Sequence, residues 1–410
     1  EENIQEMSFD LFAYRKLQDT AADCEDRCDQ IEREMRDPKA AERFALKQSQ
    51  AFVDQMEGFA LELEDELMNF SDVSYKSFVK SESEIITLFY DKFADIPLLS
   101  RMDAVAETFI DEIETLLNRD LPEEERIPLI EKFRKMYETM DFYVLYNRFL
   151  KKEGYQTLPR RPLEKRKLRY EDVYPILYLK YRLSRQAERS NIKHLVIDEM
   201  QDYSLLQYLI IRRMFSCKMT ILGDRAQTMA DQQQDVLQFL PGIFGKDLRR
   251  IEMRKSYRNT VEIASYAANL IGVTDLELFE RHGMPVLERD VTDLEAALRE
   301  AVDTLLPDEK TYETAAVIVP DEKTAERAYL ILRGILAEKD FDCGKRLSWL
   351  NRDSSSFKKG LTVTTFYLAK GLEFDQVFSI FPKDEKREIM MQAQYIAATR
   401  ALHELRVYHI

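Results

Sequence analysis

A short apolar stretch that ends in a cluster of acidic residues constrains the fold of this chain more than any other feature. Residues 194–197 (His-Leu-Val-Ile) favour a short buried strand, and Asp-Glu-Met-Gln-Asp follows directly at residues 198–202. Ligands of open α/β folds bind at the carboxyl ends of strands, where a pair of carboxylates can take part in chemistry. In a nucleotide site Asp198 would hold Mg²⁺, and Glu199 would orient or deprotonate the attacking water. The alternative is an acidic turn after an ordinary strand.

A second segment repeats this pattern further along the chain. Residues 219–222 (Met-Thr-Ile-Leu) precede Gly-Asp at 223–224, and a glutamine follows at Gln227. In order and spacing, the two segments resemble motifs II and III of superfamily 1 helicases of the UvrD/Rep type. The resemblance implies an ATPase in which Gln227 senses the γ-phosphate of ATP.

Residues 256–260 (Ser-Tyr-Arg-Asn-Thr) resemble motif IV of the same family. The resemblance implies that Tyr257 stacks on the adenine and that Arg258 reaches the γ-phosphate. A guanidinium suits this task because it is always charged and forks onto phosphate oxygens. Without the upstream motifs, Tyr257 would be interpreted as a core residue and Arg258 as a surface residue.

Residues 361–374, which end in Lys-Gly-Leu-Glu-Phe, resemble motif V. The family places the threonine of this motif near the nucleic-acid backbone and its glutamate on the ribose, which implies these roles for Thr365 and Glu373. Tyr367 stands where the helicases carry a histidine, so the details of its expected strand contact differ from the family pattern. Gly371 would allow a nucleotide to approach the backbone closely, although it could equally be a turn glycine.

Residues 392–401 resemble motif VI. The resemblance implies that Arg400 is a second arginine finger, which stabilises the charge that develops on the transferred phosphoryl group.

Helix-like and strand-like patterns alternate after motif IV. Helices are expected at residues 261–271, 294–305 and 324–337, and strands at 315–320, 361–365 and 405–410. Such alternation implies a parallel sheet. Together with the resemblance, it predicts an α/β fold with RecA-like parallel-sheet domains of the P-loop NTPase type.

The first part of the chain has a different character. Of the 11 glycines in the whole chain, only Gly58 and Gly154 precede motif II. This scarcity of glycine favours helices in the first part. Apolar residues recur at helical spacing over residues 40–70, 82–93, 101–117 and 123–150, and their aromatic stripes are typical of a core. Cys24 and Cys28 lie one helical turn apart, but no further cysteine or histidine nearby completes a zinc site, so both are interpreted as structural.

A basic, proline-containing segment at residues 155–169 follows this helical part. It is either a contact for a phosphate backbone or a solvated connection. The next segment, residues 171–182, is expected to form an amphipathic helix and resembles the segment before motif II in the HelD-type branch of the family. In that branch a large helical insertion interrupts the first RecA-like domain. The predicted division is a helical insertion domain at 1–168, the rest of the first RecA-like domain at 169–250, and the second at 251–410.

The charge balance limits the choice of partners. The 410 residues carry a net charge of −15, which disfavours unspecific adhesion to nucleic acid over the whole surface. DNA would therefore bind in a local basic groove, or else the main partner is a protein. The four cysteines fit a reduced, cytoplasmic compartment, and no apolar run approaches the length of about 18 residues that spans a membrane.

The chain contains no Gly-x-x-x-x-Gly-Lys-Ser/Thr loop, which would cradle the β-phosphate. The nearest match, at residues 242–246, is interpreted as a turn. Because the other motifs are present together, the expectation is that this loop lies upstream of Glu1, in a longer protein from which the chain was cut. The chain alone is then expected to be inactive.

The combined interpretation is part of an ATP- and Mg²⁺-dependent superfamily 1 motor. The HelD-type resemblance implies that the motor displaces or recycles RNA polymerase on DNA. A conventional DNA helicase of repair or recombination is the alternative within the enzyme class. A non-catalytic RecA-like scaffold is the alternative outside it. The sequence leaves open the polarity of translocation and the partner of the helical part.

Overall fold

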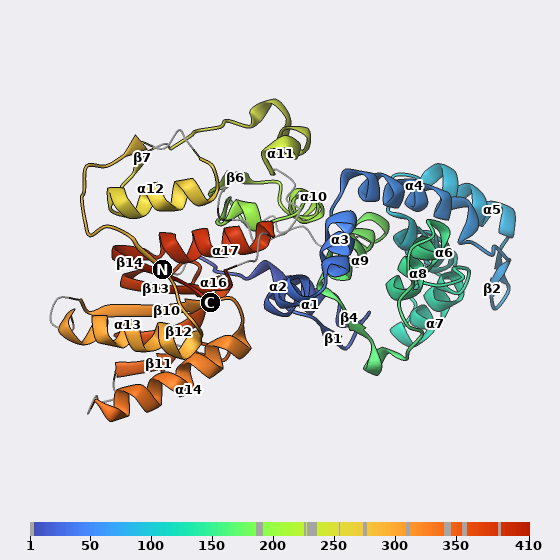
Figure 1. Cartoon of the computed structure of the whole chain (residues 1–410). Helices are drawn as coiled ribbons and strands as arrows, with labels where there is room; N and C mark the ends of the chain where they lie inside the picture. The colour runs from blue at the N-terminus through green and yellow to red at the C-terminus, as the bar shows by residue number, and fades with distance from the viewer. Residues whose placement is uncertain are drawn as a thin grey trace.

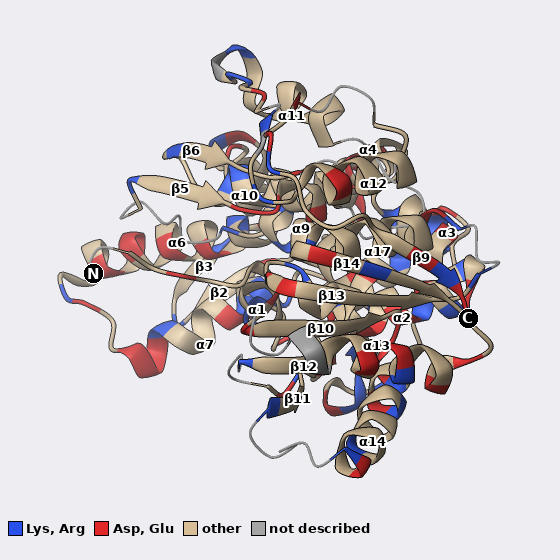
Figure 2. Ribbon diagram, turned by 60° about the vertical axis from the view of Figure 1, so that its left-hand side comes forward, with Lys and Arg blue, Asp and Glu red and all other residues tan. Residues whose placement is uncertain are grey.

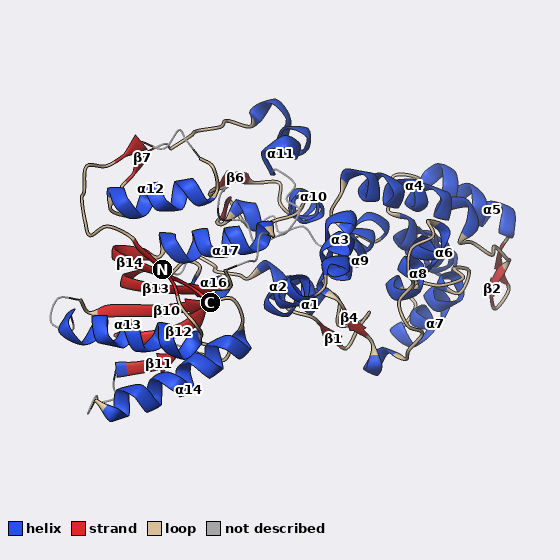
Figure 3. Cartoon of the chain, viewed as in Figure 1, coloured by secondary structure: helices blue, strands red, loops and turns tan. Residues whose placement is uncertain are grey.

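The helical part of the chain contains nine helices in the described region, joined by turns and by some longer connections (Figures 1 and 3). The computed structural model describes residues 4–185, 192–224, 227, 236–253, 255–273, 277–308, 312–339, 346–354, 359–383 and 387–410. The helices are α1 (Phe9–Lys16), α2 (Arg27–Arg36), α3 (Pro38–Lys47), α4 (Gln50–Glu66), α5 (Glu82–Thr87), α6 (Arg101–Leu117), α7 (Glu123–Arg134), α8 (Phe142–Lys152) and α9 (Tyr170–Leu183). Short strands accompany them: β1 (Asp23–Cys24) pairs with β4 (Lys167–Leu168), and β2 (Val73–Tyr75) with β3 (Phe78–Lys80).

Two helices expected to be continuous are each divided by a capping residue. Residues 40–70 form α3 and α4, because the Ser49 hydroxyl accepts the Phe52 N–H and starts a new helix. Residues 123–150 form α7 and α8, because the Asp141 carboxylate accepts the Tyr143 N–H at 2.9 Å. The apolar periodicity continues across both breaks, which explains why periodicity alone did not reveal them.

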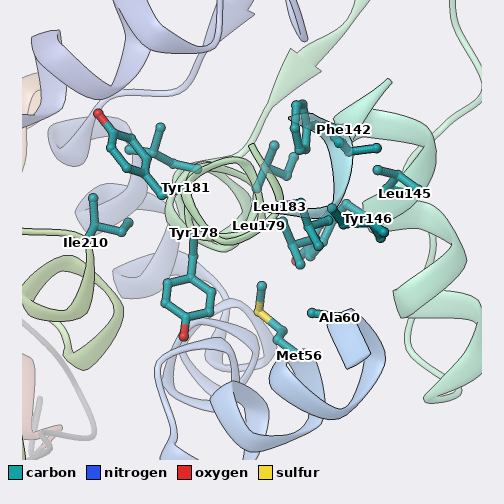
Figure 4. Packing of buried hydrophobic residues seen from close by; sticks show 14 of the residues in the cluster. Met56, Ala60, Phe142, Leu145, Tyr146, Tyr178, Leu179, Tyr181, Leu183 and Ile210 are labelled. Carbon is teal, nitrogen blue, oxygen red and sulfur yellow. The ribbon is translucent and has the colours of Figure 1, made fainter. Parts of the chain in front are cut away.

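Helix α9 is the centre of the helical part. It was expected to be amphipathic, but 13 of its 14 residues are buried. Its side chains point in different directions and meet Met56 and Ala60 of α4, Phe142 and Tyr146 of α8, and Ile210 (Figure 4). A helix that is covered on all sides is typical of the interior of a large domain, so α9 organises the helices around it.

The carboxylate cluster follows a pair of parallel strands, β5 (His194–Ile197) and β6 (Lys218–Ile221). These strands lie with α10 (Leu205–Met214) and α11 (Val236–Phe244) and share one hydrophobic core with α1, α4, α8 and α9. The prediction of a short buried strand is wrong for most of β5: Ile197 is buried, but Val196 is 61% exposed. The predicted domain boundary at residue 168 stays a prediction. The hydrophobic core contains residues from both sides of that boundary.

The rest of the chain forms a six-stranded sheet in which every pairing is parallel, in the order β11-β12-β10-β13-β14-β9. The strands are β9 (Leu287–Asp290), β10 (Thr314–Val319), β11 (Leu347–Trp349), β12 (Gly360–Thr365), β13 (Phe374–Phe381) and β14 (Ala401–His409). The predicted α/β class with a parallel sheet is confirmed. Strand β13 was not expected, and β14 begins four residues earlier than predicted.

Helices cover both faces of this sheet. One face packs against α12 (Val261–Leu270), α16 (Phe366–Ala369) and α17 (Glu388–Thr399), and the other against α13 (Leu294–Asp308) and α14 (Glu322–Glu338). Strands buried on both faces are expected to be apolar, and β10, β12 and β13 carry few charged residues, whereas α13 and α14 carry many (Figure 2). No helix in the described ranges is long and apolar enough to cross a membrane.

Candidate functional site

The carboxylates of the acidic cluster lie in a tight turn after β5. Glu199 has a left-handed backbone with φ of 53°, which is uncommon for a residue with a side chain, and its N–H donates to Asp198 Oδ1 at 2.9 Å. The Met200 N–H donates to the Leu222 carbonyl at 2.8 Å, which ties the turn to the end of β6. Asp198 is exposed, so its carboxylate is available to a cation from solvent.

Gln201 and Gly223 lock the two motif segments together. The Gln201 amide donates to Glu199 Oε2 at 2.5 Å, and its Oε1 accepts the Asp224 N–H at 3.0 Å. A Cβ on Gly223 would lie 2.4 Å from Gln201 Oε1 and 2.6 Å from the Met200 backbone nitrogen. Only glycine therefore fits at this position, because any side chain would push the two segments apart.

Gln227 and Arg400 connect the two sheet-bearing parts. The Arg400 Nη2 donates to Gln227 Oε1 at 2.9 Å, and the Gln227 amide donates to Asp224 Oδ2 at 3.0 Å. Arg400 is 1% exposed. Burial lowers its pKa, as does the nearby charge of Arg258, whereas the charges of Glu199 and Glu373 act in the opposite direction. The buried guanidinium thus donates to neutral oxygens and lies near both acidic groups and a second cation, so an anionic ligand would stabilise its charge.

Lys370 is a residue of this site that the sequence interpretation missed. Its ammonium lies 2.8 Å from both Asp202 oxygens and 3.4 Å from Glu199 Oε2, and it donates to the Gln227 carbonyl at 2.8 Å. The side chain is 6% exposed. Burial raises the pKa of Asp202, and the contact with Lys370 opposes this rise. The available sequence signal for such a lysine was Asp202, an acidic residue near the end of a strand that would be expected to pair with a cation.

A second, more open group lies beside it. The Arg258 guanidinium forms an ion pair with Glu373 at 2.6 Å, and both side chains are nearly half exposed. The Tyr257 ring is 61% exposed and lies 5.4 Å from the Phe279 ring, centroid to centroid. An exposed aromatic ring beside an arginine is a suitable platform for a base and its phosphates. Gly371 has φ of 85° and open space where a Cβ would be, so its backbone conformation is what requires glycine.

The two residues expected at the nucleic-acid strand have buried side chains. The Thr365 hydroxyl accepts the Leu368 N–H at the start of α16, and Tyr367 is 7% exposed. The Tyr367 hydroxyl donates to Glu32 Oε1 of α2 at 2.6 Å. This arrangement differs from the expectation, because neither side chain faces solvent where a strand could contact it.

The structure thus brings Glu199, Gln227, Arg400 and the unpredicted Lys370 into one network, with Arg258 and Glu373 beside it. These groups offer cations for phosphates and an exposed carboxylate, Asp198, for a metal, so they fit a Mg²⁺-nucleotide. In the described part of the chain no cluster of three or more His, Cys, Asp or Glu residues has the geometry of a metal site. Residues 242–246 lie at the end of α11 and in the turn after it, not after a strand.

The cysteines at residues 24 and 28 are partly buried free thiols. Burial raises the pKa of each to about 12, which keeps them protonated and suits a structural role.

Comparisons with known proteins relate the chain to helicases. The model of a family described as the UvrD/REP helicase N-terminal domain matches residues 2–229. No curated protein matches the chain at a significant level. Among solved structures, the C-terminal domain of a possible DNA helicase from Lactobacillus plantarum WCFS1 is 24% identical, with a TM-score of 0.30; the match covers 38% of this chain and 88% of that one.

Two viral structures are also similar to parts of the chain. The PRRSV helicase is 14% identical over 65% of this chain and 45% of its own, with a TM-score of 0.32. Arterivirus nonstructural protein 10 (helicase), solved in a complex with DNA, is 15% identical over 65% of this chain and 51% of its own, with a TM-score of 0.29. The chain therefore spans about half the length of these viral helicases. The TM-scores are too low to support an argument from any single structure.

Proposed function

The chain belongs to the UvrD/Rep helicase family, and on that premise we propose that it is part of a superfamily 1 motor that hydrolyses ATP between its two sheet-bearing parts. The observation that carries the proposal is the contact of Arg400 with Gln227 across these parts. A γ-phosphate bound at this contact would touch residues of both sheet-bearing parts. Its hydrolysis would therefore change the contacts that hold the two parts together.

The first group of proposed roles concerns the phosphates and the attacking water. Asp198 holds Mg²⁺, which neutralises charge on the phosphates when it is bound. Glu199 orients and deprotonates the attacking water, and the proton moves to its carboxylate. Gln227 contacts the γ-phosphate, while the guanidinium groups of Arg258 and Arg400 stabilise the charge that develops on it.

Three further residues of the site bind the rest of the nucleotide. Tyr257 stacks on the adenine, and Glu373 accepts a hydrogen bond from the ribose. Gly371 allows the backbone to follow the nucleotide closely. The present ion pair of Glu373 with Arg258 supports this proposal, because it keeps both side chains at the same point of the candidate site.

We further propose that the motor acts on RNA polymerase bound to DNA, as the HelD-type resemblance implies, and not primarily as an unwinding helicase. The buried state of Thr365 and Tyr367 supports this, since the expected strand contacts are covered. The net charge of −15 also favours a protein partner over unspecific DNA binding. The helical part, with its own extensive core, would be the element that contacts the polymerase.

The test is ATP turnover by the full-length protein, alone, with RNA polymerase, and with single-stranded DNA. Glu199→Gln is expected to lower kcat by about 10²–10⁴-fold while a fluorescent ATP analogue still binds, because general-base catalysis contributes about this much. Glu326→Gln, an exposed residue on α14, is the matched control and should leave turnover unchanged.

The outcomes separate the candidate functions. Stimulation by polymerase, lost in Glu199→Gln, supports the proposal. Stimulation by DNA alone would instead indicate a conventional helicase. The absence of turnover under all three conditions would exclude the motor and leave a scaffold of RecA-like domains.

A further inference from the structure

The turn that carries Glu199 is held by a hydroxyl group of α10, in addition to the contacts of Gln201 and Gly223. The Tyr208 hydroxyl donates to the Met200 carbonyl at 3.1 Å, and the Tyr208 side chain is fully buried. Burial raises the pKa of this phenol, so it stays protonated and can donate. Because Met200 directly follows Glu199, this bond restrains the backbone next to the proposed general base.

The start of α10 explains how Tyr208 reaches the turn. The Ser204 hydroxyl accepts the Gln207 N–H at 3.3 Å, and the Gln207 side chain accepts the Ser204 N–H at 2.7 Å. Tyr208 is the fourth residue of this helix, and helical side chains point back toward the amino end. The ring of Tyr208 is therefore directed toward the turn that precedes its own helix.

A row of aromatic rings links this turn to the helical part. The Tyr203 ring, which directly follows the acidic cluster, lies 5.7 Å from the Tyr208 ring and 6.0 Å from the Phe9 ring of α1, centroid to centroid. Phe9 is 8% exposed and also stacks on Tyr174 of α9 at 5.7 Å. Close-packed interiors have few voids, so a displaced ring displaces its neighbours. Phe9 thus lies between α9 and the residues that follow the general base.

Helix α1 is fixed to α9 by the carboxylate next to Phe9. Asp10 Oδ1 accepts the Tyr170 hydroxyl at 3.1 Å and also accepts the Tyr174 hydroxyl. Burial raises the pKa of Asp10, and the hydrogen bonds of the two tyrosines oppose this rise. Since α9 is itself joined to α3, α4 and α8 by ion pairs and a hydrogen bond, a displacement of these helices would reach Phe9 through α9.

We propose that Tyr208 and Phe9 are positioning residues for the general base: Tyr208 holds the turn that carries Glu199, and Phe9 makes the position of this turn depend on the helical part. A protein that displaces the helical part would then change the rate of ATP hydrolysis without touching the nucleotide. The inference rests on the proposed function, because it names a route by which the same site is regulated. A shift of about 1 Å at a catalytic group can change a rate by about 10²-fold.

The test compares ATP turnover of the full-length protein with that of Tyr208→Phe and Phe9→Leu. The first variant removes only a hydroxyl, and the second replaces a ring by a smaller apolar side chain. Each is expected to lower kcat about tenfold and to keep KM for ATP within about twofold, because a shifted base affects the chemical step and not nucleotide binding. The double variant should lose clearly less than the product of about 10², because both residues act on one turn.

The contribution of α9 is tested with Asp10→Ala, which removes the carboxylate that two tyrosines of α9 share. It is expected to lower kcat about fivefold, again without a change in KM, because α1 is then held less firmly against Tyr203. Combined with Phe9→Leu, it should add little, since both changes act through the same ring contact.

Each of the first two variants has a matched control in the same hydrophobic core. Tyr137→Phe removes a buried hydroxyl that donates to the Leu98 carbonyl, and Phe52→Leu removes a buried ring that contacts Phe149. Both should leave kcat unchanged, because the hydrogen-bond and ring contacts of Tyr137 and Phe52 lie within the helical part.

Hydrogen exchange gives a second measurement that needs no turnover. Exchange over residues 199–203 should rise in Tyr208→Phe and in Phe9→Leu, because the turn is less restrained, and should stay unchanged in the two control variants. Exchange that is equally slow in all variants would show that neither residue holds the turn.

Other results would also overturn the inference. An unchanged kcat in Tyr208→Phe would show that its hydroxyl does not position the base, and an equal loss in the controls would indicate general destabilisation. Losses that multiply in the double variant would show that the two residues act independently. Full turnover in Asp10→Ala would exclude the route through α9.

The inference and the proposed function fail in different ways. If Glu199→Gln abolishes turnover while Tyr208→Phe and Phe9→Leu retain it, only the inference is rejected. If Glu199→Gln retains full turnover, the proposed function is rejected, and the inference is rejected with it.

Discussion

The close approach of Gly223 to residues 200–201 sets the geometry of the candidate site at the scale of single residues. It allows Gln201 to bond both Glu199 and Asp224, and Asp224 in turn accepts from Gln227. The general base and the γ-phosphate sensor of the proposed mechanism are therefore connected through one amide. A small backbone change at Gly223 would move both.

Gly223→Ala is expected to destabilise the protein by about 1–3 kcal/mol, the usual cost of forcing extra atoms into a packed region. The new Cβ would meet the Met200 backbone, which cannot rotate away. Urea unfolding measures the change. Gly58→Ala is the matched control: it lies in α4 with nothing within 4 Å of its Cβ, and should stabilise by about 0.5–1 kcal/mol. Equal effects at the two sites would contradict the proposed crowding.

Glu262 provides a prediction for acid pH. Its carboxylate lies 2.9 Å from His282 Nδ1 and accepts the Gly283 N–H at 2.8 Å, and these bonds lower its pKa from 4.5 to about 2. A carboxyl group whose pKa is lowered by folding stabilises the protein above its unfolded pKa and loses this contribution as the pH falls toward its folded pKa. Glu262→Gln should therefore reduce stability at neutral pH, and the difference should shrink as the pH falls from 4.5 toward 2. A difference independent of pH would disprove the assignment.

At the scale of elements, α9 shows how a helix can be covered on all sides and still contain charges. Its Asp172 is 1% exposed and lies 2.6 Å from the Lys47 ammonium of α3, and it also accepts the Tyr146 hydroxyl of α8 at 2.8 Å. Three helices thus meet at one carboxylate. Burial raises the pKa of Tyr146, and the charge of Asp172 adds to this rise, so the tyrosine stays a donor.

Asp172→Asn should cost about 3–5 kcal/mol, because it leaves the Lys47 ammonium buried without a counter-ion. The double variant Lys47→Met/Asp172→Leu should recover most of that loss, since it removes both charges. Denaturant unfolding compares the two. Asp23→Asn breaks the exposed pair with Lys167 and should cost only about 0–1 kcal/mol. A double variant as unstable as the single one would show that the packing, and not the charge, matters.

At the scale of the whole molecule, the described residues form one core that joins the helical part to β5, β6, α10 and α11, and two cores on the faces of the large sheet. Helix α2 and the contacts of Lys370 and Arg400 link these bodies. These links are mainly ion pairs or a single helix. The body that contains the helical part and the body that contains the large sheet can therefore move relative to each other without unpacking a core. Such an arrangement suits a motor whose parts close on a nucleotide.

Core substitutions should therefore act on one body at a time. Phe149→Ala, in the helical core, should destabilise by about 3–5 kcal/mol and raise hydrogen exchange in α4, α8, α9 and α10. Leu332→Ala, in α14, should cost about 2–5 kcal/mol and raise exchange in the large sheet. Exchange that rises across the entire chain in both variants would indicate a single cooperative unit.

The sequence by itself determined the features that depend on neighbours along the chain. Alternation of apolar runs predicted the parallel sheet that contains β10 and β12, and helical spacing predicted α6 and α14. The acidic cluster after β5 and the motif around Arg400 could be recognised because their residues are adjacent. In each case the signal comes from local periodicity or spacing, which folding preserves.

Only the tertiary structure decided which distant groups meet. Asp29 and Arg352 are 323 residues apart, and Lys370 and Asp202 are 168 apart, so neither contact has a local signature. The same holds for the burial of α9 on all sides and for Tyr367, whose hydroxyl is bound by Glu32. These contacts arise from packing, because a buried charge or hydroxyl must find whichever partner the fold brings to it.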